Sequence, residues 1–181
     1  MRAALAIIVV AVAALPAWVG AAGEEDSNFH CTKIAGLRFR STEVISAAPT
    51  LPGDPQGSYC KAIGVIRPAT PGGTPDIHFQ VNMPAQWNEQ AVQYGGGAPG
   101  APASGLGPLL KEGYVTFGSD QAWQAATPSQ AKDLRDSALV LIHARYQRGP
   151  QRTWFYDPTP GGLEGKAARE RWPALYDGVL P

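Results

Sequence analysis

Apolar and polar residues alternate in short strand-like segments along much of this chain. The clearest case is residues 77–83, where Ile, Phe, Val and Met alternate with His, Gln and Asn until Pro84. A period of two predicts a strand with one buried face and one exposed face. Further strands are predicted at residues 59–67, 91–94, 114–117 and 153–156.

Apolar residues at helical spacing follow Pro128. Thr127 can act as the N-cap, Pro128 occupies the first helical position and Gln130 completes a capping box. The residues at helical spacing are Leu134, Ala138, Leu141 and Ile142. A second helix is predicted at residues 161–171. Because strands alternate with helices, the pattern favours an α/β sheet over a β-sandwich.

The first 22 residues are basic at the start, apolar in the middle and rich in small residues at the end. This order is typical of a secretory signal peptide. A membrane anchor is the alternative, but the apolar run is shorter than the roughly 20 residues that span a bilayer, and Pro16 interrupts it. We therefore expect residues 1–22 to be a signal peptide and residues 23–181 to form one domain, secreted or periplasmic and without membrane attachment.

The charge balance excludes one large class of partners. The chain carries 15 basic and 15 acidic residues, so its formal net charge at neutral pH is zero. Nucleic acid binding depends on a basic field, which this composition lacks. No paired-carboxylate, metal-ligand or phosphate-loop pattern stands out, so we expect no cofactor and no metal.

The chain has two cysteines, Cys31 and Cys60. Export would expose them to an oxidising compartment, where pairing is favoured. A zinc pair is the alternative, but neither cysteine has a second ligand at zinc spacing, and His30 beside Cys31 is too little. We expect a Cys31–Cys60 disulfide that joins the N-terminal arm to the strand at residues 59–67.

Residues 154–165 have the layout of a strand, a sharp turn and a helix opened by glycine. In an α/β-hydrolase this layout carries a nucleophilic serine within the sequence G-x-S-x-G. Here the five positions are residues 157–161, the serine position is Thr159, and only the last glycine, Gly161, is kept. The sequence therefore predicts a hydrolase turn without its usual nucleophile.

Several further segments resemble the tannase and feruloyl esterase family of secreted α/β-hydrolases, which cut esters of plant phenolic acids. The resemblance extends from about Cys31 to Pro181. It rests on the Tyr-Cys pair at 59–60, the strand and Trp-Asn at 79–88, the glycine run at 93–100, Ser119-Asp120 after Gly113-Tyr114, and the glycines and aromatic residues of 161–178. No single segment is specific, but their shared order is hard to obtain by chance.

The resemblance implies a fold as well as a chemistry. It implies an α/β-hydrolase-like, mostly parallel sheet with flanking helices, of which this chain would be the N-terminal part, truncated after the nucleophile helix. The sheet would then end at the nucleophile strand, residues 153–156. We expect such an exposed sheet edge to favour self-association.

An esterase of this kind needs a nucleophile, a histidine base, an acid that orients the base, and an oxyanion hole. In this fold the chain order is Ser, then the acid, then His. No histidine follows Thr159, because His30, His78 and His143 all precede it. None of the three is expected to act as the base. Asp120 follows a strand and is expected to structure its loop.

The predicted turn is poorly suited to acyl transfer. A nucleophile there adopts a strained backbone with positive φ, which is costly for the β-branched Thr159. The next residue normally donates its N–H to the oxyanion, and Pro160 has no N–H. Asp157 is expected to cap the turn through its side chain. Gly96 and Gly97 are either the remaining oxyanion donors or a tight turn after a strand.

The functional expectation has three forms. The first is a carboxylic-ester hydrolase for feruloyl or galloyl esters, in a truncated or degenerate copy with little or no activity alone. The alternative is a non-catalytic secreted protein that keeps the scaffold to bind phenolic esters or a partner. A product with no role is the third interpretation.

Overall fold

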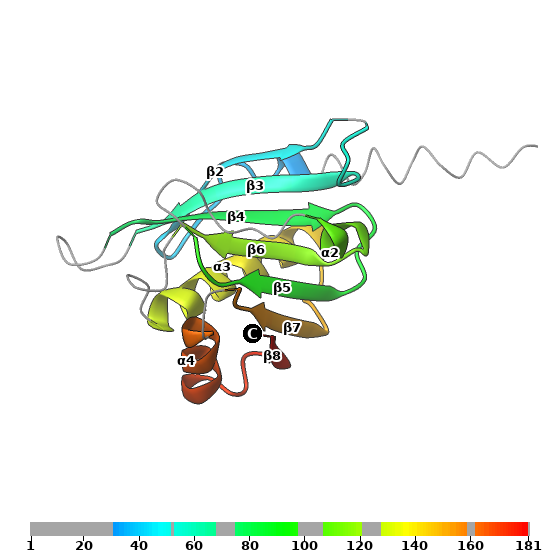
Figure 1. Ribbon diagram of the computed structural model, residues 1–181. Helices are drawn as coiled ribbons and strands as arrows, with labels where there is room; N and C mark the ends of the chain where they lie inside the picture. Colours follow the sequence, from blue (N-terminus) through cyan, green and yellow to red (C-terminus); the bar gives the residue numbers. More distant parts are fainter. Residues whose placement is uncertain are drawn as a thin grey trace, which may run out of the picture.

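The computed structural model describes residues 31–51, 53–67, 75–97, 107–120, 128–158 and 162–180. The predicted signal peptide, the N-cap Thr127 and the nucleophile position Thr159 lie outside these ranges. In chain order the described elements are β1 (Arg38–Phe39), β2 (Thr42–Pro49), β3 (Tyr59–Ile66), β4 (Ile77–Pro84), β5 (Gln90–Tyr94), α2 (Pro108–Lys111), β6 (Val115–Ser119), α3 (Pro128–Tyr146), β7 (Arg152–Tyr156), α4 (Leu163–Arg171) and β8 (Gly178–Leu180). Within the described residues the strands form one eight-stranded sheet in the order β1-β2-β3-β4-β6-β5-β7-β8 (Figure 1).

The sheet has an antiparallel half and a parallel half. The pairs β1–β2, β2–β3, β3–β4 and β4–β6 are antiparallel, whereas β5–β6, β5–β7 and β7–β8 are parallel. The connections from β1 to β2, β2 to β3 and β3 to β4 contain 2, 9 and 10 residues. These are shorter than the crossover that parallel neighbours need. The expected mostly parallel arrangement is therefore found only in the C-terminal half, where α2, α3 and α4 lie in the connections.

The sequence-based expectation that the sheet ends at the nucleophile strand is wrong. That strand is β7, and β8 pairs with its outer edge so that Phe155 lies opposite Val179. The backbone N–H of Asp157 continues this pairing by donating to the Leu180 carbonyl at 2.9 Å. The edge of the sheet on this side is thus a strand of three residues, and short edge strands limit edge-to-edge pairing. Self-association through this edge stays a prediction.

The long helix α3 lies against one face of the sheet and carries the apolar stripe predicted from its spacing (Figure 1). This stripe meets buried side chains of β4 and β6, and the shared core includes Leu134, Ala138, Leu141, Ile142, Phe79, Val81, Met83 and Phe117. Burial of each large side chain contributes about 1.5–3 kcal/mol. A smaller cluster joins Phe155 of β7 to Ala168 of α4 and to Tyr176. The two helices therefore hold the parallel half of the sheet from one side.

The second face of β4 differs from the sequence-based expectation of an exposed polar face. Gln80 is 8% exposed and Asn82 is fully buried. The Gln80 amide donates to Asn82 Oδ1 at 2.8 Å, and the Asn82 amide donates to Thr116 Oγ1 of β6 at 3.1 Å. Because these polar groups satisfy one another, they can lie inside the molecule. A period of two predicts which residues share a face but not whether that face is covered.

The predicted disulfide is confirmed. Cys31 and Cys60 are bonded, with their Cα atoms 5.6 Å apart, and both are fully buried. Cys60 lies in β3, so the bond attaches the segment before β1 to the centre of the antiparallel half. The cysteines are 29 residues apart in sequence.

We expect replacement of both Cys31 and Cys60 by alanine to lower the free energy of unfolding by about 3–4 kcal/mol, because the unfolded chain regains the entropy of an open loop of this length. Urea unfolding followed by circular dichroism measures the change. Reduction of the unaltered protein should give a similar loss and have no effect on the double variant. Equal stability of the two proteins would contradict the expectation.

Candidate functional site

The carboxyl ends of β5, β6 and β7 meet at one edge of the sheet, because these strands are parallel (Figure 1). We call this the carboxyl edge. It carries the glycine segment Gly95–Gly97 after β5, Asp120 after β6, and Asp157 after β7. In open α/β sheets ligands bind outside the carboxyl ends of the strands. The segments that the sequence singled out for chemistry therefore lie at the edge where chemistry is expected.

The glycine segment is held by its neighbours on both sides. The Gly95 N–H donates to the Tyr156 carbonyl of β7 at 2.8 Å. The Gly96 N–H donates to Glu164 Oε2 of α4 at 3.0 Å, and Gly96 has a φ of 72°, which side chains rarely tolerate. The segment is thus fixed both to the strand before the predicted turn and to the helix after it.

Gly97 makes the closest approach on the other side. A methyl group at Gly97 would collide with the Ser119 carbonyl oxygen and lie 3.2 Å from the Asp120 Cα. Glycine is therefore required for the segment to lie against the end of β6.

The start of α4 is organised by Asp157. The helix N-cap, Gly162, has a φ of 54° and provides no side-chain cap. The buried Asp157 carboxylate takes that role, since its Oδ2 accepts the Gly165 N–H in the first turn at 3.0 Å. A negative charge beside the N-terminus of a helix is stabilising. The sequence predicted that the Asp157 side chain caps the turn. In the structure it accepts a hydrogen bond from the first turn of α4, the helix that follows.

Glu164 is a functional candidate that the sequence analysis missed. Burial raises the pKa of Glu164 to about 7, the nearby Asp157 carboxylate adds to the increase, and the hydrogen bond from the Gly96 N–H opposes it. A carboxyl group with such a pKa changes charge near neutral pH. An acidic residue in the first turn of the helix after the nucleophile position was the available signal.

Of the two glycines predicted as oxyanion donors, Gly96 contacts α4 and Gly97 packs against the end of β6. In this structure the Gly96 N–H is bonded to Glu164. A substrate oxyanion would have to replace that carboxylate to use the same donor. The oxyanion role of Gly96 and Gly97 stays a prediction, as does the role of Thr159.

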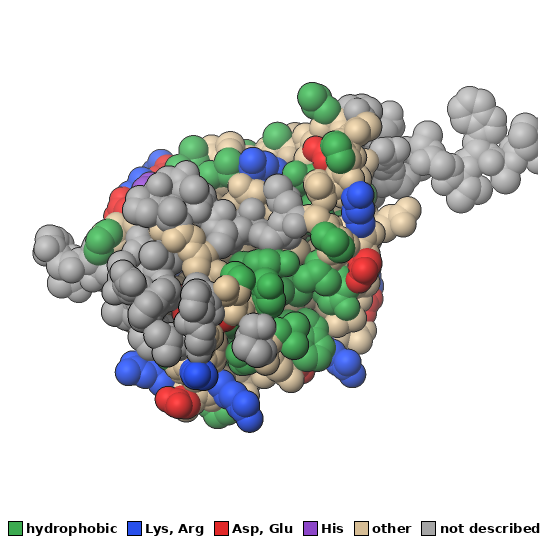
Figure 2. Space-filling view, in the orientation of Figure 1, with side chains coloured by type: hydrophobic (Ala, Val, Ile, Leu, Met, Phe, Trp, Pro, Cys, Tyr) green, Lys and Arg blue, Asp and Glu red, His purple; other side chains and the backbone are tan. Residues whose placement is uncertain are grey.

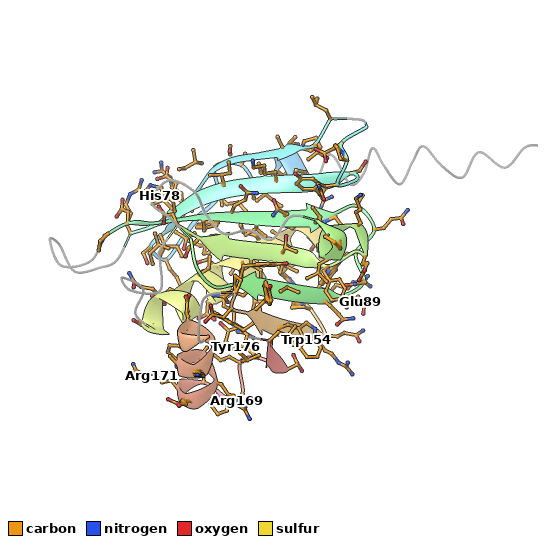
Figure 3. All side chains as sticks on the ribbon, viewed as in Figure 1. His78, Glu89, Trp154, Arg169, Arg171 and Tyr176 are labelled. Atoms are coloured by element: carbon orange, nitrogen blue, oxygen red, sulfur yellow. A yellow bond between two sulfur atoms is a disulfide. The ribbon has the colours of Figure 1, made fainter. Side chains whose placement is uncertain are left out.

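The structure brings His78 and Asp120 together, which the sequence did not predict. His78 Nδ1 lies 2.9 Å from Asp120 Oδ2, and the His78 N–H donates to Asp120 Oδ1 at 2.9 Å. Figure 3 places His78 at the carboxyl edge, at the opposite end of the sheet from Glu89. Asp120 does structure its surroundings, as expected, but its partner is a histidine ring. His143, the other histidine that the structure describes, is exposed on α3.

Aromatic side chains line the face of β5 and β7 that α3 does not cover. Tyr94 and Tyr156 lie opposite each other in the parallel pair, with ring centroids 5.1 Å apart in an edge-to-face contact. Trp154, labelled in Figure 3, donates from Nε1 to Gln90 Oε1 at 3.0 Å. Figure 2 shows hydrophobic side chains gathered over these strands. The two tyrosines directly precede the glycine segment and the predicted turn.

In the part of the chain that the structure describes, no three His, Cys, Asp or Glu side chains gather as a candidate metal site. The chemistry available at the carboxyl edge is that of carboxylates, imidazole and backbone N–H groups.

Comparison with known proteins agrees with this geometry. The family described as tannase and feruloyl esterase matches the chain over residues 60–181. The chain belongs to the tannase and feruloyl esterase family. The matched region begins in β3 and includes the glycine segment, Asp120 and the turn with Thr159.

Similar curated proteins are named as esterases or as a hydrolase. An uncharacterized esterase of Agrobacterium fabrum is 36% identical over 173 residues, which cover 80% of this chain and 31% of the relative. A mono(2-hydroxyethyl) terephthalate hydrolase of Piscinibacter sakaiensis is 24% identical over 182 residues, covering 82% of this chain and 29% of the relative. A probable feruloyl esterase of Arthroderma benhamiae is 27% identical over 124 residues, covering 54% and 23%. The chain spans about a third of the length of such relatives.

Solved structures share the fold. An esterase from Aspergillus oryzae superposes with a TM-score of 0.63 at 17% identity, covering 84% of this chain and 36% of that one. Feruloyl esterase B from the same organism gives 0.59 at 14% identity, with the same coverage. The sheet with its flanking helices is therefore an α/β-hydrolase-like fold, as the resemblance implied.

We expect Gly97→Ala to destabilise the protein by about 2 kcal/mol, because the added methyl group must push the glycine segment away from Ser119. Thermal unfolding measures the loss. Gly149→Ala is the matched control, since a methyl group there has nothing within 4 Å, and it should change the stability by less than about 0.5 kcal/mol. Equal effects of the two substitutions would contradict the packing argument.

Glu164 makes stability depend on pH in a definite direction. Its pKa rises from 4.5 in the unfolded chain to about 7 in the folded protein, so folding favours the neutral acid. The stabilisation is complete below pH 4.5 and is lost as the pH rises through about 7. The groups that act on the Glu164 carboxyl are the Gly96 N–H and the Asp157 carboxylate at the end of β7, and the charge of Glu164 in turn helps to raise the pKa of Tyr176, after the larger effect of burial.

We expect Glu164→Gln to flatten this dependence, because the amide keeps an acceptor for the Gly96 N–H but never ionises. Between pH 5 and pH 8 the unaltered protein should lose on the order of 2 kcal/mol more than the variant. Urea unfolding at both pH values measures the difference. Glu170→Gln, at an exposed site on the same helix, should behave like the unaltered protein. If Glu170→Gln flattens the profile equally, the effect does not come from Glu164.

Proposed function

We propose that this chain is a carboxylic-ester hydrolase for esters of plant phenolic acids, such as feruloyl and galloyl esters, with low activity because its turn is degenerate. The observation that carries the proposal is the meeting of the glycine segment with the start of α4, where the Gly96 N–H contacts Glu164. In this fold these are the two places that supply oxyanion donors and the nucleophile.

The aromatic side chains beside these segments support a phenolic substrate. Tyr94 and Tyr156 are partly buried, and each lies one residue before a functional segment. Aromatic rings favour edge-to-face or offset contact with another ring, which contributes about 0.5–1.5 kcal/mol beyond burial. A feruloyl or galloyl ring placed on these tyrosines would bring its ester towards the glycine segment. A feruloyl esterase among the relatives agrees with this class of substrate.

Low activity follows from the chemistry of two residues. Thr159 offers a secondary hydroxyl in place of the serine hydroxyl, and Pro160 has no N–H to donate. Loss of one oxyanion donor costs about 2.7–4 kcal/mol of barrier lowering. The engagement of the Gly96 N–H with Glu164 would lower activity further as long as that bond is kept.

We also propose that the protein acts outside the cytoplasm. The buried disulfide is typical of proteins that fold in an oxidising compartment, and the predicted signal peptide provides the route. None of the helices within the described ranges is long and apolar enough to cross a bilayer. Soluble phenolic esters released from plant material would be accessible to such a protein.

A second candidate is a binding protein of hydrolase ancestry. The observation that favours it is again the Gly96–Glu164 bond, because a donor occupied by a carboxylate does not serve an oxyanion. Such a protein would keep the aromatic face for phenolic esters and leave them intact.

We expect Thr159→Ser combined with Pro160→Gly to raise kcat for methyl ferulate by about 10- to 100-fold, since one oxyanion donor accounts for about 10²–10³ in rate and other groups of the site are unchanged. The matched control is Thr159→Val with Pro160→Gly, which restores the N–H without a hydroxyl and should show no gain. Product release measured by chromatography gives the rates.

Calorimetric titration with methyl ferulate separates the two candidates. Binding without any gain in the serine variant would favour the binding protein. An equal gain in both double variants would contradict a nucleophile at residue 159. The proposal as a whole is overturned if no variant binds or hydrolyses the ferulate or the gallate ester.

A further inference from the structure

A histidine and a carboxylate lie together at the carboxyl edge, next to the glycine segment and outside the turn. His78 is the second residue of β4, and Asp120 directly follows β6. The antiparallel register of these strands continues past their paired residues, because the Asp120 N–H donates to the His78 carbonyl at 2.9 Å. The two side chains therefore stand on adjacent strands at the same level.

Asp120 holds the His78 ring in one orientation. Its Oδ1 accepts the His78 N–H and its Oδ2 lies 2.9 Å from Nδ1. A carboxylate can only accept, so the hydrogen of this bond is on Nδ1, and in the neutral ring the lone pair is then on Nε2. This is the orientation that a histidine base has when an aspartate positions it.

A histidine base must be accessible to water, while the carboxylate that orients it can be buried, and the two side chains differ in this way. The Asp120 side chain is 5% exposed, whereas the His78 side chain is 50% exposed. Nε2 lies on the side of the ring opposite the carboxylate and can meet solvent there. If Asp120 served only to hold β4 and β6 together, hydrogen bonds to the His78 backbone would be enough, and no bond to the imidazole would be needed.

The dyad is adjacent to the segment where an ester would bind. A methyl group on Gly97 would lie 3.2 Å from the Asp120 Cα, so Gly97 packs directly against the residue that holds the ring. The other charged groups near the start of β4 are Arg67, Asp76, Glu43 and Arg38. Arg67 lies 3.7 Å from Asp76 and 2.6 Å from Glu43, and Arg38 also pairs with Glu43. The charges of these four groups therefore compensate one another, and the half-exposed His78 ring is held by the residue against which Gly97 packs.

We propose that His78 and Asp120 form a water-activating dyad that hydrolyses aryl esters without a nucleophilic residue. Nε2 takes a proton from water as the water oxygen bonds to the ester carbonyl carbon. The imidazolium then returns that proton to the phenolate oxygen as its C–O bond breaks. The products are a carboxylic acid and a phenol, and no other reactant is consumed. His78 is the catalytic residue and Asp120 is a positioning residue.

The proposal goes beyond the proposed class of substrate, because aryl esters carry the phenol as the alcohol part rather than on the acid part, and it does not use Thr159 or Pro160. Phenolates are good leaving groups, so water activation by one imidazole is sufficient for their esters, whereas alkyl esters need the complete acyl-transfer machinery. General-base catalysis by a positioned side chain contributes about 10²–10⁴ in rate. The expected substrates are thus esters with a phenol as the alcohol part.

The test uses p-nitrophenyl acetate and the full chain. His78→Gln should lower kcat/KM for enzyme-catalysed hydrolysis at least about 10-fold, whereas His143→Gln, at an exposed site on α3, should leave it unchanged. Circular dichroism verifies that both variants are folded. Unchanged hydrolysis in His78→Gln, or an equal loss in His143→Gln, overturns the proposal.

Two further readouts distinguish positioning from simple support of the fold. Asp120→Asn should lower kcat more than it changes KM and should alter the pH dependence of kcat, since the amide favours the wrong ring tautomer. A change in KM alone would contradict a positioning role. Nitrogen-15 NMR of the unaltered protein should show His78 protonated at Nδ1, and a ring protonated at Nε2 instead would overturn the dyad without any need for a variant.

The failure of this proposal can be told apart from failure of the proposed function. Methyl ferulate binding tests the phenolic acid site and is independent of His78. Hydrolysis of p-nitrophenyl acetate that depends on His78 supports the dyad whether or not methyl ferulate binds.

Discussion

Parallel pairing of β5 with both β6 and β7 is the constraint on which the arrangement of the carboxyl edge depends. Tyr94, the last residue of β5, lies opposite Gly118 on one side and Tyr156 on the other. The three strands therefore finish at the same level, and the segments that follow them are brought into contact. An antiparallel β5 would end at the opposite edge of the sheet, and the glycine segment would touch neither Asp120 nor α4.

Three carboxylates then tie these segments to one another through backbone N–H groups. Asp157 accepts from Gly165, Glu164 accepts from Gly96, and Asp120 accepts from His78. A buried carboxylate without partners costs several kcal/mol, so each acid depends on the backbone that it holds. The same dependence limits function, because a donor that satisfies a buried acid is not available to a substrate until that acid moves or is protonated. Glu164, with a pKa of about 7, takes up a proton near neutral pH, which makes release of the Gly96 N–H less costly.

Much of the framework could be predicted from sequence because the signals were local. The apolar stripe of α3, five of the strands and the pairing of two cysteines all follow from neighbouring residues or from a count. β1, β2 and β8 were missed. β1 and β8 have two and three residues, too few for a periodic pattern, and an irregularity between Val44 and Ser46 interrupts the period of two in β2. The His78–Asp120 pair joins residues 42 positions apart, and its existence depends on β6 lying next to β4, which no local pattern specifies. Glu164 was missed for a related reason, because its pKa depends on burial that only the packed helix provides.

The two reactions proposed for the carboxyl edge, acyl transfer at the predicted turn and water activation by His78, can be compared by their expected effects on the activation barrier. In the proposed hydrolase, the absence of an N–H at Pro160 would remove about 2.7–4 kcal/mol of barrier lowering from acyl transfer at the predicted turn, and the strain expected of a β-branched residue at the nucleophile position would add to that loss. A positioned general base contributes about 10²–10⁴ in rate, which is about 3–5 kcal/mol. The barrier lowering expected from the dyad is therefore about as large as the loss expected at the predicted turn. The dyad depends on β4 and β6 and not on Thr159 or Pro160. For an ester whose leaving group needs little assistance, activation of water by His78 is the less demanding route. For an alkyl ester, the barrier without a nucleophile and a complete oxyanion hole stays too high for one imidazole to overcome.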